Sequence, residues 1–164
     1  MPNVPGSRSI AARALVCAGL AGGKSEVTNT PVCDDTTAIT GCINQLTSSA
    51  VVIGTTTNVD GFGAVKPTGV VLDCNASGTT MRFIAALALL TDEEMTLTGT
   101  VRLLERPMDG LTEVLAACGK TVTDEGRIRK ISGHSQFPDE LTVDASKSGQ
   151  FVSGLLMALG AAGK

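Results

Sequence analysis

The sequence contains few aromatic and few charged residues. Of its 164 residues, 2% are aromatic, with four Phe and neither Trp nor Tyr, and 18% are charged, with a formal net charge of −3. Sites that stack bases or sugars use exposed aromatic rings, and nucleic-acid-binding faces carry an excess of Lys and Arg. The composition therefore argues against a stacking site and against a broad nucleic-acid-binding surface. Any arginines that bind an anion must act locally.

Histidine and paired cysteines are also scarce. His134 is the only histidine, and the five cysteines include no C-x-x-C pair. A Ser-His-Asp triad or a His-based metal cluster cannot be assembled from this chain, and neither a disulfide framework nor a zinc site is indicated. Cys17, Cys42 and Cys118 fall in apolar helical patterns, so we expect them to be buried free thiols.

Long apolar segments are missing as well. No apolar run is long enough to span a bilayer, and the N-terminus begins with turn-forming residues instead of the charged and then apolar pattern of a signal peptide. Together with the free thiols, this pattern favours a cytoplasmic location. The sequence is nevertheless 43% hydrophobic, which supplies enough Leu, Val, Ile and Ala for one sizeable core.

The first motif is a tight turn that leads into an apolar helix. Pro5-Gly6 favours the turn, serines on both sides of Arg8 are good helix N-caps, and residues 14–20 are apolar. A helix N-terminus offers free N–H donors and a partial positive charge. Ser9, Arg8 and Arg13 therefore form a plausible phosphate or carboxylate pocket. The alternative is an ordinary capped helix with two solvated arginines.

Short strands and amphipathic helices alternate along the rest of the chain. Strands are predicted at 26–29, 51–53, 70–72, 95–98 and 141–144, a hairpin at 120–123 and 127–131, helices at 36–46, 83–90, 108–118 and 151–158, and a polar turn at 55–63. Asp34 and Asp35 precede one of these helices, and we interpret them as helix-capping residues in preference to catalytic acids.

An internal repeat organises the chain. A Ser/Thr/Gly-rich turn that leads into an apolar helix occurs at Pro5–Arg13, Asn75–Arg82 and Ser146–Gln150. The numbers of Arg13 and Arg82 differ by 69, and so do those of Thr79 and Ser148. Repeats of one supersecondary unit present the same corner of each unit on one face. Three helix N-termini at one place would concentrate N–H donors, which favours the anion site over the solvated arginines.

The repeat divides the chain into units of about 5–74, 75–143 and 144–164. The third unit is incomplete, because the sequence stops at Lys164, just past its first helix. We therefore interpret the chain as a piece of a longer protein.

Five segments, in chain order, resemble motifs of the 5-enolpyruvylshikimate-3-phosphate (EPSP) synthase family. They are Pro5–Leu15 (PGSKSxxxRAL in the family), Asp34–Thr36 (SDDT), Asn75–Arg82 (NAGTAMR, here with one extra residue), Glu105–Met108 (RERPM) and Val143–Phe151 (VDxSxSSQF). The sister family, UDP-N-acetylglucosamine enolpyruvyl transferase, shares the fold but lacks the PGSKS and RERP elements. The chain thus resembles the N-terminal portion of an EPSP synthase.

The resemblance implies an α/β (α+β) fold made of repeated βαβαββ units, the inside-out α/β barrel of enolpyruvyl transferases. Residues 1–164 would form about two and a half units of one substrate-binding domain, and the second domain is absent. The implied activity is that of 3-phosphoshikimate 1-carboxyvinyltransferase. This transferase of aromatic amino-acid biosynthesis, the target of glyphosate, moves the enolpyruvyl group of phosphoenolpyruvate to the 5-hydroxyl of shikimate 3-phosphate and releases phosphate. The resemblance implies no metal or organic cofactor, and the charge and hydropathy of the chain predict no nucleic-acid or membrane partner.

Site residues follow from the same motifs, position by position. The resemblance implies contacts to shikimate 3-phosphate from Arg8, Ser9, Arg13, Ser148, Gly149 and Gln150, and contacts to phosphoenolpyruvate from Arg8, Gly78, Arg106 and Gln150. Arg8 is the one catalytic candidate, because it takes the place of a family lysine that touches both substrates. An arginine is bulkier and planar, and Gly149 also departs from the family by replacing the second serine of SSQ.

The missing half limits what this chain can do. In the family, the general acid/base aspartate and glutamate and a second lysine lie there, so we expect the chain to be inactive alone and to need its C-terminal half as a partner. Two other readings of the sequence are a non-catalytic anion- or phosphosugar-binding module and an inert fragment. The alternatives for single residues are that Gly78 is a turn glycine and that Arg106 is a solvated residue at a helix start.

Overall fold

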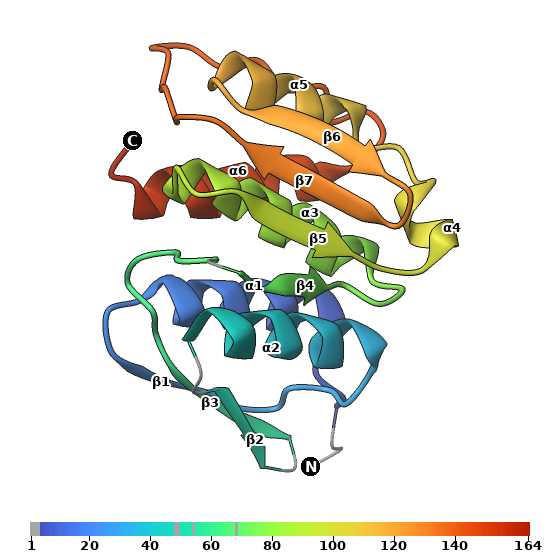
Figure 1. Cartoon of the computed structure of the whole chain (residues 1–164). Coiled ribbons are helices and arrows are strands. Elements are labelled where there is room, and N and C mark those ends of the chain that lie inside the picture. The colour runs from blue at the N-terminus through green and yellow to red at the C-terminus, as the bar shows by residue number, and fades with distance from the viewer. Residues whose placement is uncertain (1–3, 48–49, 54, 68) are drawn as a thin grey trace.

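The computed structural model of the chain describes residues 4–47, 50–53, 55–67 and 69–164. Helices and strands alternate through the chain (Figure 1). In order they are α1 (Arg8–Leu20), β1 (Lys24–Val27), α2 (Asp34–Thr47), β2 (Ala50–Ile53), β3 (Thr56–Asp60), β4 (Val71–Asp73), α3 (Gly78–Ala86), the 3-10 helix η1 (Leu87–Leu90), β5 (Met95–Thr98), α4 (Val101–Leu104), α5 (Asp109–Ala117), β6 (Thr121–Glu125), β7 (Ile128–Ser132) and α6 (Gly149–Ala161).

Two sheets repeat one strand order. In the first sheet the order is β1-β3-β2 with antiparallel pairs, and in the second β5-β7-β6 is antiparallel in the same way. The second sheet has one more strand, β4, which pairs in parallel with β5 through Leu72 and Leu97. The order helix, strand, helix, hairpin therefore occurs twice, as the internal repeat predicts.

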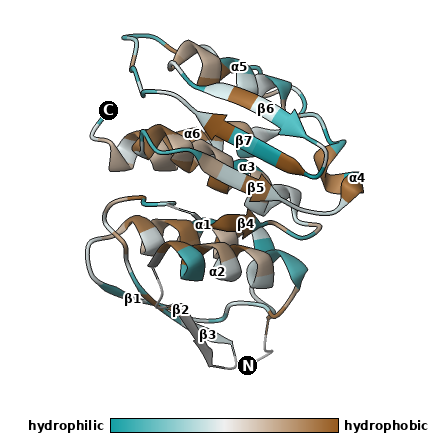
Figure 2. Ribbon diagram, in the orientation of Figure 1, coloured by the Kyte–Doolittle hydropathy of each residue, from teal (hydrophilic) through white to brown (hydrophobic). Residues whose placement is uncertain are grey.

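The core lies around helix α3, between the two sheets (Figure 1). Its residues Phe83, Ile84, Ala85 and Ala86 are fully buried. Both α2 and α6 pack against α3, and Figure 2 shows hydrophobic residues along α1 and α6 in the middle of the molecule. Gly154 permits the close approach of α6, because a Cβ there would lie 3.3 Å from the carbonyl oxygen of Arg82.

Serine side chains set the starts of α1, α3 and α6. Ser7, Ser77 and Ser148 each have extended backbone and accept a hydrogen bond from a backbone N–H of the first turn, from Ile10, Thr80 and Gln150 respectively. These are N-caps of the ordinary kind. The three polar turns of the repeat therefore become three capped helix starts.

Two predicted segments are wrong. Residues 55–63 were expected to be a polar turn, but Thr56–Asp60 forms β3, the central strand of its sheet. Its β-branched residues Thr57 and Val59 are both buried. The alternation of buried and more exposed side chains along the segment therefore favoured a strand, although the residues of the segment are mostly polar. Residues 141–144 were expected to be a strand but are irregular. The equivalent strand β4, before α3, takes its partner β5 from the segment after that helix, whereas residues 141–144 have no partner strand among the described residues.

Smaller differences concern helix ends and one cysteine. Helix α3 starts at Gly78, five residues before the predicted Phe83, and its last turn is the 3-10 helix η1. The short helix α4 was not predicted. Cys42 and Cys118 are buried as expected, but the expectation for Cys17 is wrong. Cys17 is exposed, whereas its neighbours Leu15 and Val16 are buried in the core.

Candidate functional site

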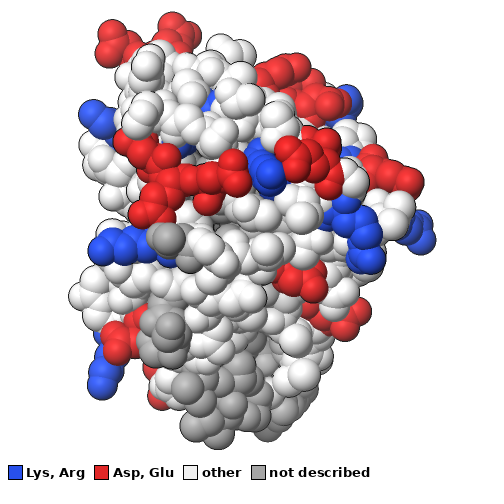
Figure 3. Space-filling model, viewed as in Figure 1, with Lys and Arg blue, Asp and Glu red and all other residues white. Residues whose placement is uncertain are grey.

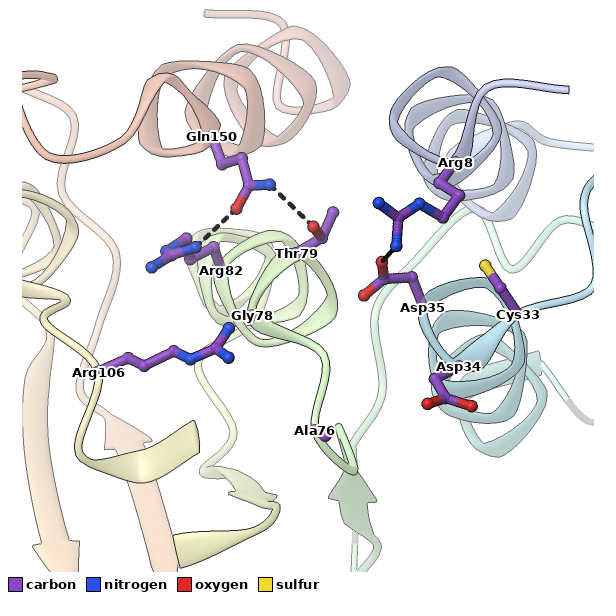
Figure 4. A pocket seen from close by; sticks show the side chains of 10 residues that line it. All are labelled: Arg8, Cys33, Asp34, Asp35, Ala76, Gly78, Thr79, Arg82, Arg106 and Gln150. Carbon is purple, nitrogen blue, oxygen red and sulfur yellow. Dashed lines mark hydrogen bonds and ion pairs between the residues drawn. The ribbon is translucent and has the colours of Figure 1, made fainter. Parts of the chain in front are cut away.

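A cavity of about 510 Å³ opens where the starts of α1, α2, α3 and α6 meet (Figure 4). Its lining residues are Arg8, Cys33, Asp34, Asp35, Ala76, Gly78, Thr79, Arg82, Arg106 and Gln150. Arg8 comes from α1, Gly78 from α3 and Gln150 from α6, so each of the three repeated helix starts contributes to the cavity. This convergence is what the repeat predicts of an anion site at helix N-termini.

Gly78 lies between two guanidinium groups. A Cβ built on Gly78 would be 3.0 Å from Nη1 of Arg106 and 3.1 Å from Nη1 of Arg82. Both contacts are tighter than ordinary van der Waals distance, so a side chain at this position would displace at least one arginine. The absence of a side chain at residue 78 therefore leaves room for both arginines, which lie on either side of Gly78 in the cavity lining (Figure 4).

Arg82 is fixed in place from several sides. Its Nη1 donates a hydrogen bond of 2.7 Å to Oε1 of Gln150, and Nε2 of Gln150 donates one of 2.8 Å to Oγ1 of Thr79. The guanidinium also lies over the ring of Phe151, at 5.4 Å from its centroid. These contacts connect α3 with the first turn of α6, and they hold Arg82 in the lining of the cavity (Figure 4).

The two arginines form a positive centre without a counterion. Burial, and then the charge of Arg106, lower the pKa of Arg82 from its ordinary value. In the part of the chain that the structure describes, neither guanidinium has a carboxylate partner. Like charges held together without a partner are costly unless an anion binds. The arrangement is therefore suited to a phosphate or carboxylate.

Arg8 closes the cavity from the side of α1. Its Nη1 lies 3.7 Å from Oδ2 of Asp35, on the first turn of α2, and the Arg8 side chain is 70% exposed. On the face shown in Figure 3, Lys and Arg are interspersed with Asp and Glu and do not form one broad basic surface. Arg8, Arg82 and Arg106 thus provide local positive charge in a chain whose net charge is negative.

The predicted site residues fall into two groups. Arg8, Gly78, Arg106 and Gln150, the four expected at phosphoenolpyruvate, all line the cavity. The other four lie outside its lining, at the starts of α1 and α6: Ser9, Arg13, Ser148 and Gly149.

Arg13 joins this second group together. Its Nη2 donates a hydrogen bond of 2.8 Å to Oγ of Ser153, and its Nη1 donates one of 2.7 Å to the carbonyl oxygen of Ser9. Ser153 in turn donates to the carbonyl oxygen of Gly149. Residues expected at shikimate 3-phosphate are therefore adjacent to one another, between α1 and α6. Space around the Cα of Gly149 is open.

Two cavity residues, Arg82 and Asp35, were not predicted to belong to the site. Arg82 ends the second repeated motif and stands 69 positions after Arg13, a signal that could have identified it. Asp35 was interpreted as a helix cap. Its engagement with Arg8 and with Ser77 depends on how α1, α2 and α3 pack, and no local pattern encodes that.

The described residues also limit other kinds of site. Within residues 4–164, apart from the undescribed positions, no group of three or more His, Cys, Asp or Glu side chains is placed to hold a metal ion. Over the same residues, the helices are too short or too polar to cross a bilayer. The five cysteines are free thiols.

The fold of the chain is similar to that of solved enolpyruvyl transferases. The EPSP synthase of Acinetobacter baumannii superposes with a TM-score of 0.81 at 23% identity, over 96% of this chain and 37% of that chain. The enolpyruvyl transferase NikO of Streptomyces tendae gives a TM-score of 0.60 at 14% identity, over 94% and 36%. At these identities the likeness shows the fold.

Sequence comparison then identifies the family. The model of the EPSP synthase (3-phosphoshikimate 1-carboxyvinyltransferase) family matches residues 3–164, so the chain belongs to this family. It is 39% identical over 158 residues to the 3-phosphoshikimate 1-carboxyvinyltransferase of Thermococcus kodakarensis, and 34% identical over 164 residues to that of Photobacterium profundum. The matches cover 94% and 95% of this chain but 37% and 38% of those relatives. The chain thus spans little more than a third of their length.

Proposed function

We propose that this chain forms one wall of the active site of a 3-phosphoshikimate 1-carboxyvinyltransferase, the shikimate-pathway enzyme for which its relatives are named. The observation that carries the proposal is the pair of guanidinium groups around Gly78, which have no carboxylate partner among the described residues. Membership of the family supports the same activity.

Phosphoenolpyruvate carries a phosphate and a carboxylate on one small carbon frame, so its site must hold two anions together. Arg106 and Arg82 would bind one of them next to Gly78, where the backbone allows a close approach. The Nε2 group of Gln150 lies beside them, and Arg8 faces them from α1. Charge-assisted hydrogen bonds from such groups orient a ligand as well as bind it.

Shikimate 3-phosphate would lie along the starts of α1 and α6. Arg13, held by Ser153 and the backbone of Ser9, would neutralise its phosphate, and Ser148 caps α6, the same helix that carries Ser153. This placement would direct the 5-hydroxyl toward the cavity. In the reaction, the 5-hydroxyl loses its proton as its oxygen bonds to the enol carbon, and the methylene carbon takes up a proton to become a methyl group. The tetrahedral adduct then loses phosphate together with one methyl proton, which restores the double bond. Holding both substrates in contact accounts for much of the expected acceleration.

We expect the chain alone to bind weakly and not to turn over. A hydrogen bond to a charged group contributes about 1.5–3 kcal/mol, while a micromolar ligand requires about 8 kcal/mol. One wall with a few such contacts would therefore bind in the millimolar range. The groups that transfer protons would have to come from the rest of the enzyme.

Two measurements test the proposal. The purified chain is titrated with phosphoenolpyruvate and, separately, with shikimate 3-phosphate, and backbone amide shifts are followed near Gly78 and Ser9. Shifts at Gly78 with the first ligand and at Ser9 with the second support the two subsites, and no shift up to tens of millimolar contradicts them. Co-expression with the C-terminal part of a relative then asks whether phosphate release appears. Binding without any restored activity would favour a non-catalytic anion-binding module.

A further inference from the structure

The two carboxylate oxygens of Asp35 contact two different walls of the cavity. Oδ1 accepts a hydrogen bond of 2.5 Å from Oγ of Ser77, the residue that caps α3. Oδ2 lies 3.7 Å from Nη1 of Arg8, at the start of α1. The backbone carbonyl of Asp35 also accepts from Oγ1 of Thr80, at 3.4 Å. Asp35 is therefore the one link among the described contacts that joins Arg8 to the turn before Gly78.

The geometry points to Asp35 as a positioning residue of the anion site: it holds the Arg8 guanidinium at a fixed place relative to the start of α3. This inference rests on the proposed function, because it concerns the same cavity. Asp35 would not touch the ligand. It would act through Arg8 on one side and through Ser77, next to Gly78, on the other.

Asp35 is not needed as a cap for its own helix. Oγ1 of Thr36 accepts from the backbone N–H of Cys33 and donates to the carbonyl oxygen of Pro31, so the start of α2 is tied down by Thr36. Asp34, one position earlier in the same first turn, is exposed and has no hydrogen bond or ion pair with any described residue. Both carboxylates share the favourable helix terminus, but only Asp35 reaches across to α1 and α3.

An arginine at position 8 makes such a restraint useful. Its side chain is long and 70% exposed, so an unrestrained guanidinium would lose conformational freedom each time a ligand bound. A guanidinium presents several N–H donors in one plane. Arg8 can therefore face Asp35 with one edge and a ligand with another, which the compact ammonium of a lysine does less well.

Asp34 provides a matched control. Asp35→Asn and Asp34→Asn each remove one negative charge from the cavity lining, and loss of charge alone should tighten the binding of an anion in both. Only Asp35→Asn also releases Arg8, while its amide oxygen can still accept from Ser77. Phosphoenolpyruvate is the probe, and the dissociation constant is taken from the amide shift of Gly78 in the 164-residue chain. This readout reports on folded molecules and is not moved by a change in stability.

We expect the dissociation constant of Asp35→Asn to exceed that of Asp34→Asn by about threefold or more, the scale of a partly exposed ion pair. A smaller ratio overturns the positioning role. If the unaltered chain shows no shift at Gly78 with phosphoenolpyruvate, the proposed function is wrong. If the unaltered chain binds but the two variants bind alike, only the positioning role of Asp35 is wrong.

A second measurement needs no change at position 35. The Nε–Hε signal of Arg8, assigned from its loss in Arg8→Lys, reports the order of the side chain through its heteronuclear relaxation. Arg102 is the reference, because it is exposed and has no partner among the described residues. Arg8 should be clearly more ordered than Arg102 before any ligand is added. Equal disorder of the two side chains would overturn the inference.

Discussion

Nη1 of Arg82 and Oε1 of Gln150 are 2.7 Å apart, and this hydrogen bond joins α3 to the first turn of α6 in the lining of the cavity. Its two residues come from two of the three repeated motifs. The bond holds Nη1 of Arg82 in place, and this atom and Nη1 of Arg106 both lie next to Gly78. The first prediction concerns this pair.

Replacing Gln150 with Ala should weaken phosphoenolpyruvate binding. The change removes the acceptor that orients Arg82 and the amide that donates to Thr79. A hydrogen bond to a charged group contributes about 1.5–3 kcal/mol, and we expect about tenfold weaker binding by NMR titration. Gln45→Ala, on the exposed face of α2, is the control. Equal affinities of the two variants would show that Arg82 is oriented without Gln150.

Adding one methyl group at position 78 should separate binding from stability. The Cβ of Gly78→Ala would lie 3.0 Å from Arg106 and 3.1 Å from Arg82, both at flexible side-chain ends. The helix should tolerate alanine, with unfolding free energy unchanged or higher by at most about 1 kcal/mol. Phosphoenolpyruvate affinity should fall about fivefold or more.

Gly41→Ala is the matched control for this test. Gly41 lies within α2, and a Cβ there would meet no atom within 4 Å. We expect it to stabilise the fold by up to about 1 kcal/mol and to leave the dissociation constant as it is. Denaturant unfolding and the titration are run on both variants, and a loss of affinity common to both would argue against a specific role of Gly78.

Asp124 should matter for stability and for its pH dependence. Nε and Nη2 of Arg129 donate to the two carboxylate oxygens at 2.7 and 2.8 Å, and the Arg129 side chain is 8% exposed against 59% for Asp124. Removing the carboxylate leaves a buried guanidinium unpaired. Because water reaches Asp124, we expect Asp124→Asn to cost about 1–2 kcal/mol, less than for a fully buried pair.

The sign of the pH effect follows from the same contact. The hydrogen bond from Arg129 lowers the pKa of Asp124 below its ordinary value in the folded chain. The stabilisation is therefore complete above the unfolded pKa, at about pH 4, and is lost as the pH falls through the folded pKa. Urea unfolding of Asp124→Asn should show a flatter decline below pH 4 than the unaltered chain. Asp139→Asn, exposed and without a partner among the described residues, should not.

Thiol labelling should distinguish two classes of cysteine. Cys42, Cys74 and Cys118 are buried. A hydrogen bond with Cys42, together with burial, raises the pKa of the Cys74 thiol well above its ordinary value, and burial raises the pKa of Cys118. Low thiolate content and poor access both slow reaction. Ellman's reagent should therefore modify Cys17 and Cys33 first, and the other three only on unfolding.

Protection of Cys33 by phosphoenolpyruvate would test whether the ligand binds in the cavity. Cys33 lines the cavity, whereas Cys17 lies on the exposed side of α1. Saturating ligand should slow labelling of Cys33 and leave the rate at Cys17 unchanged. Mass spectrometry of the labelled peptides resolves the two sites, and equal protection of both would point to a global effect of the ligand.

Local motifs carried most of what the sequence could predict of the site. Arg8, Gly78 and Gln150 each stand within three residues of a serine N-cap, so a turn and a helix start fix their position by themselves. The repeat then predicts that the three starts lie together, and the cavity confirms it. The contacts of Asp35 could not be predicted, because they depend on how close α2 packs to α1 and α3.

The same limit explains the errors in the fold. Residues 56–60 look polar, yet they form a central strand because β1 and β2 pair with them on both sides. Residues 141–144 have the β-branched and alternating character of a strand but no partner strand among the described residues, and they stay irregular. For residues 56–60, β2 is the neighbouring strand of a hairpin but β1 lies far away in the sequence, and residues 141–144 lack a partner among the described residues. The local pattern alone therefore does not decide strand formation.

The two guanidinium groups beside Gly78, which have no carboxylate partner among the described residues, have a consequence for the folded chain as a whole. An anion that binds only when Arg82 and Arg106 are brought together favours folding by mass action, in proportion to its concentration over its dissociation constant. Even a weakly held anion at buffer concentration would then raise the melting temperature. For this molecule, replacing chloride with phosphate in the buffer should therefore raise the free energy of unfolding, and a bound substrate should raise it in the same way.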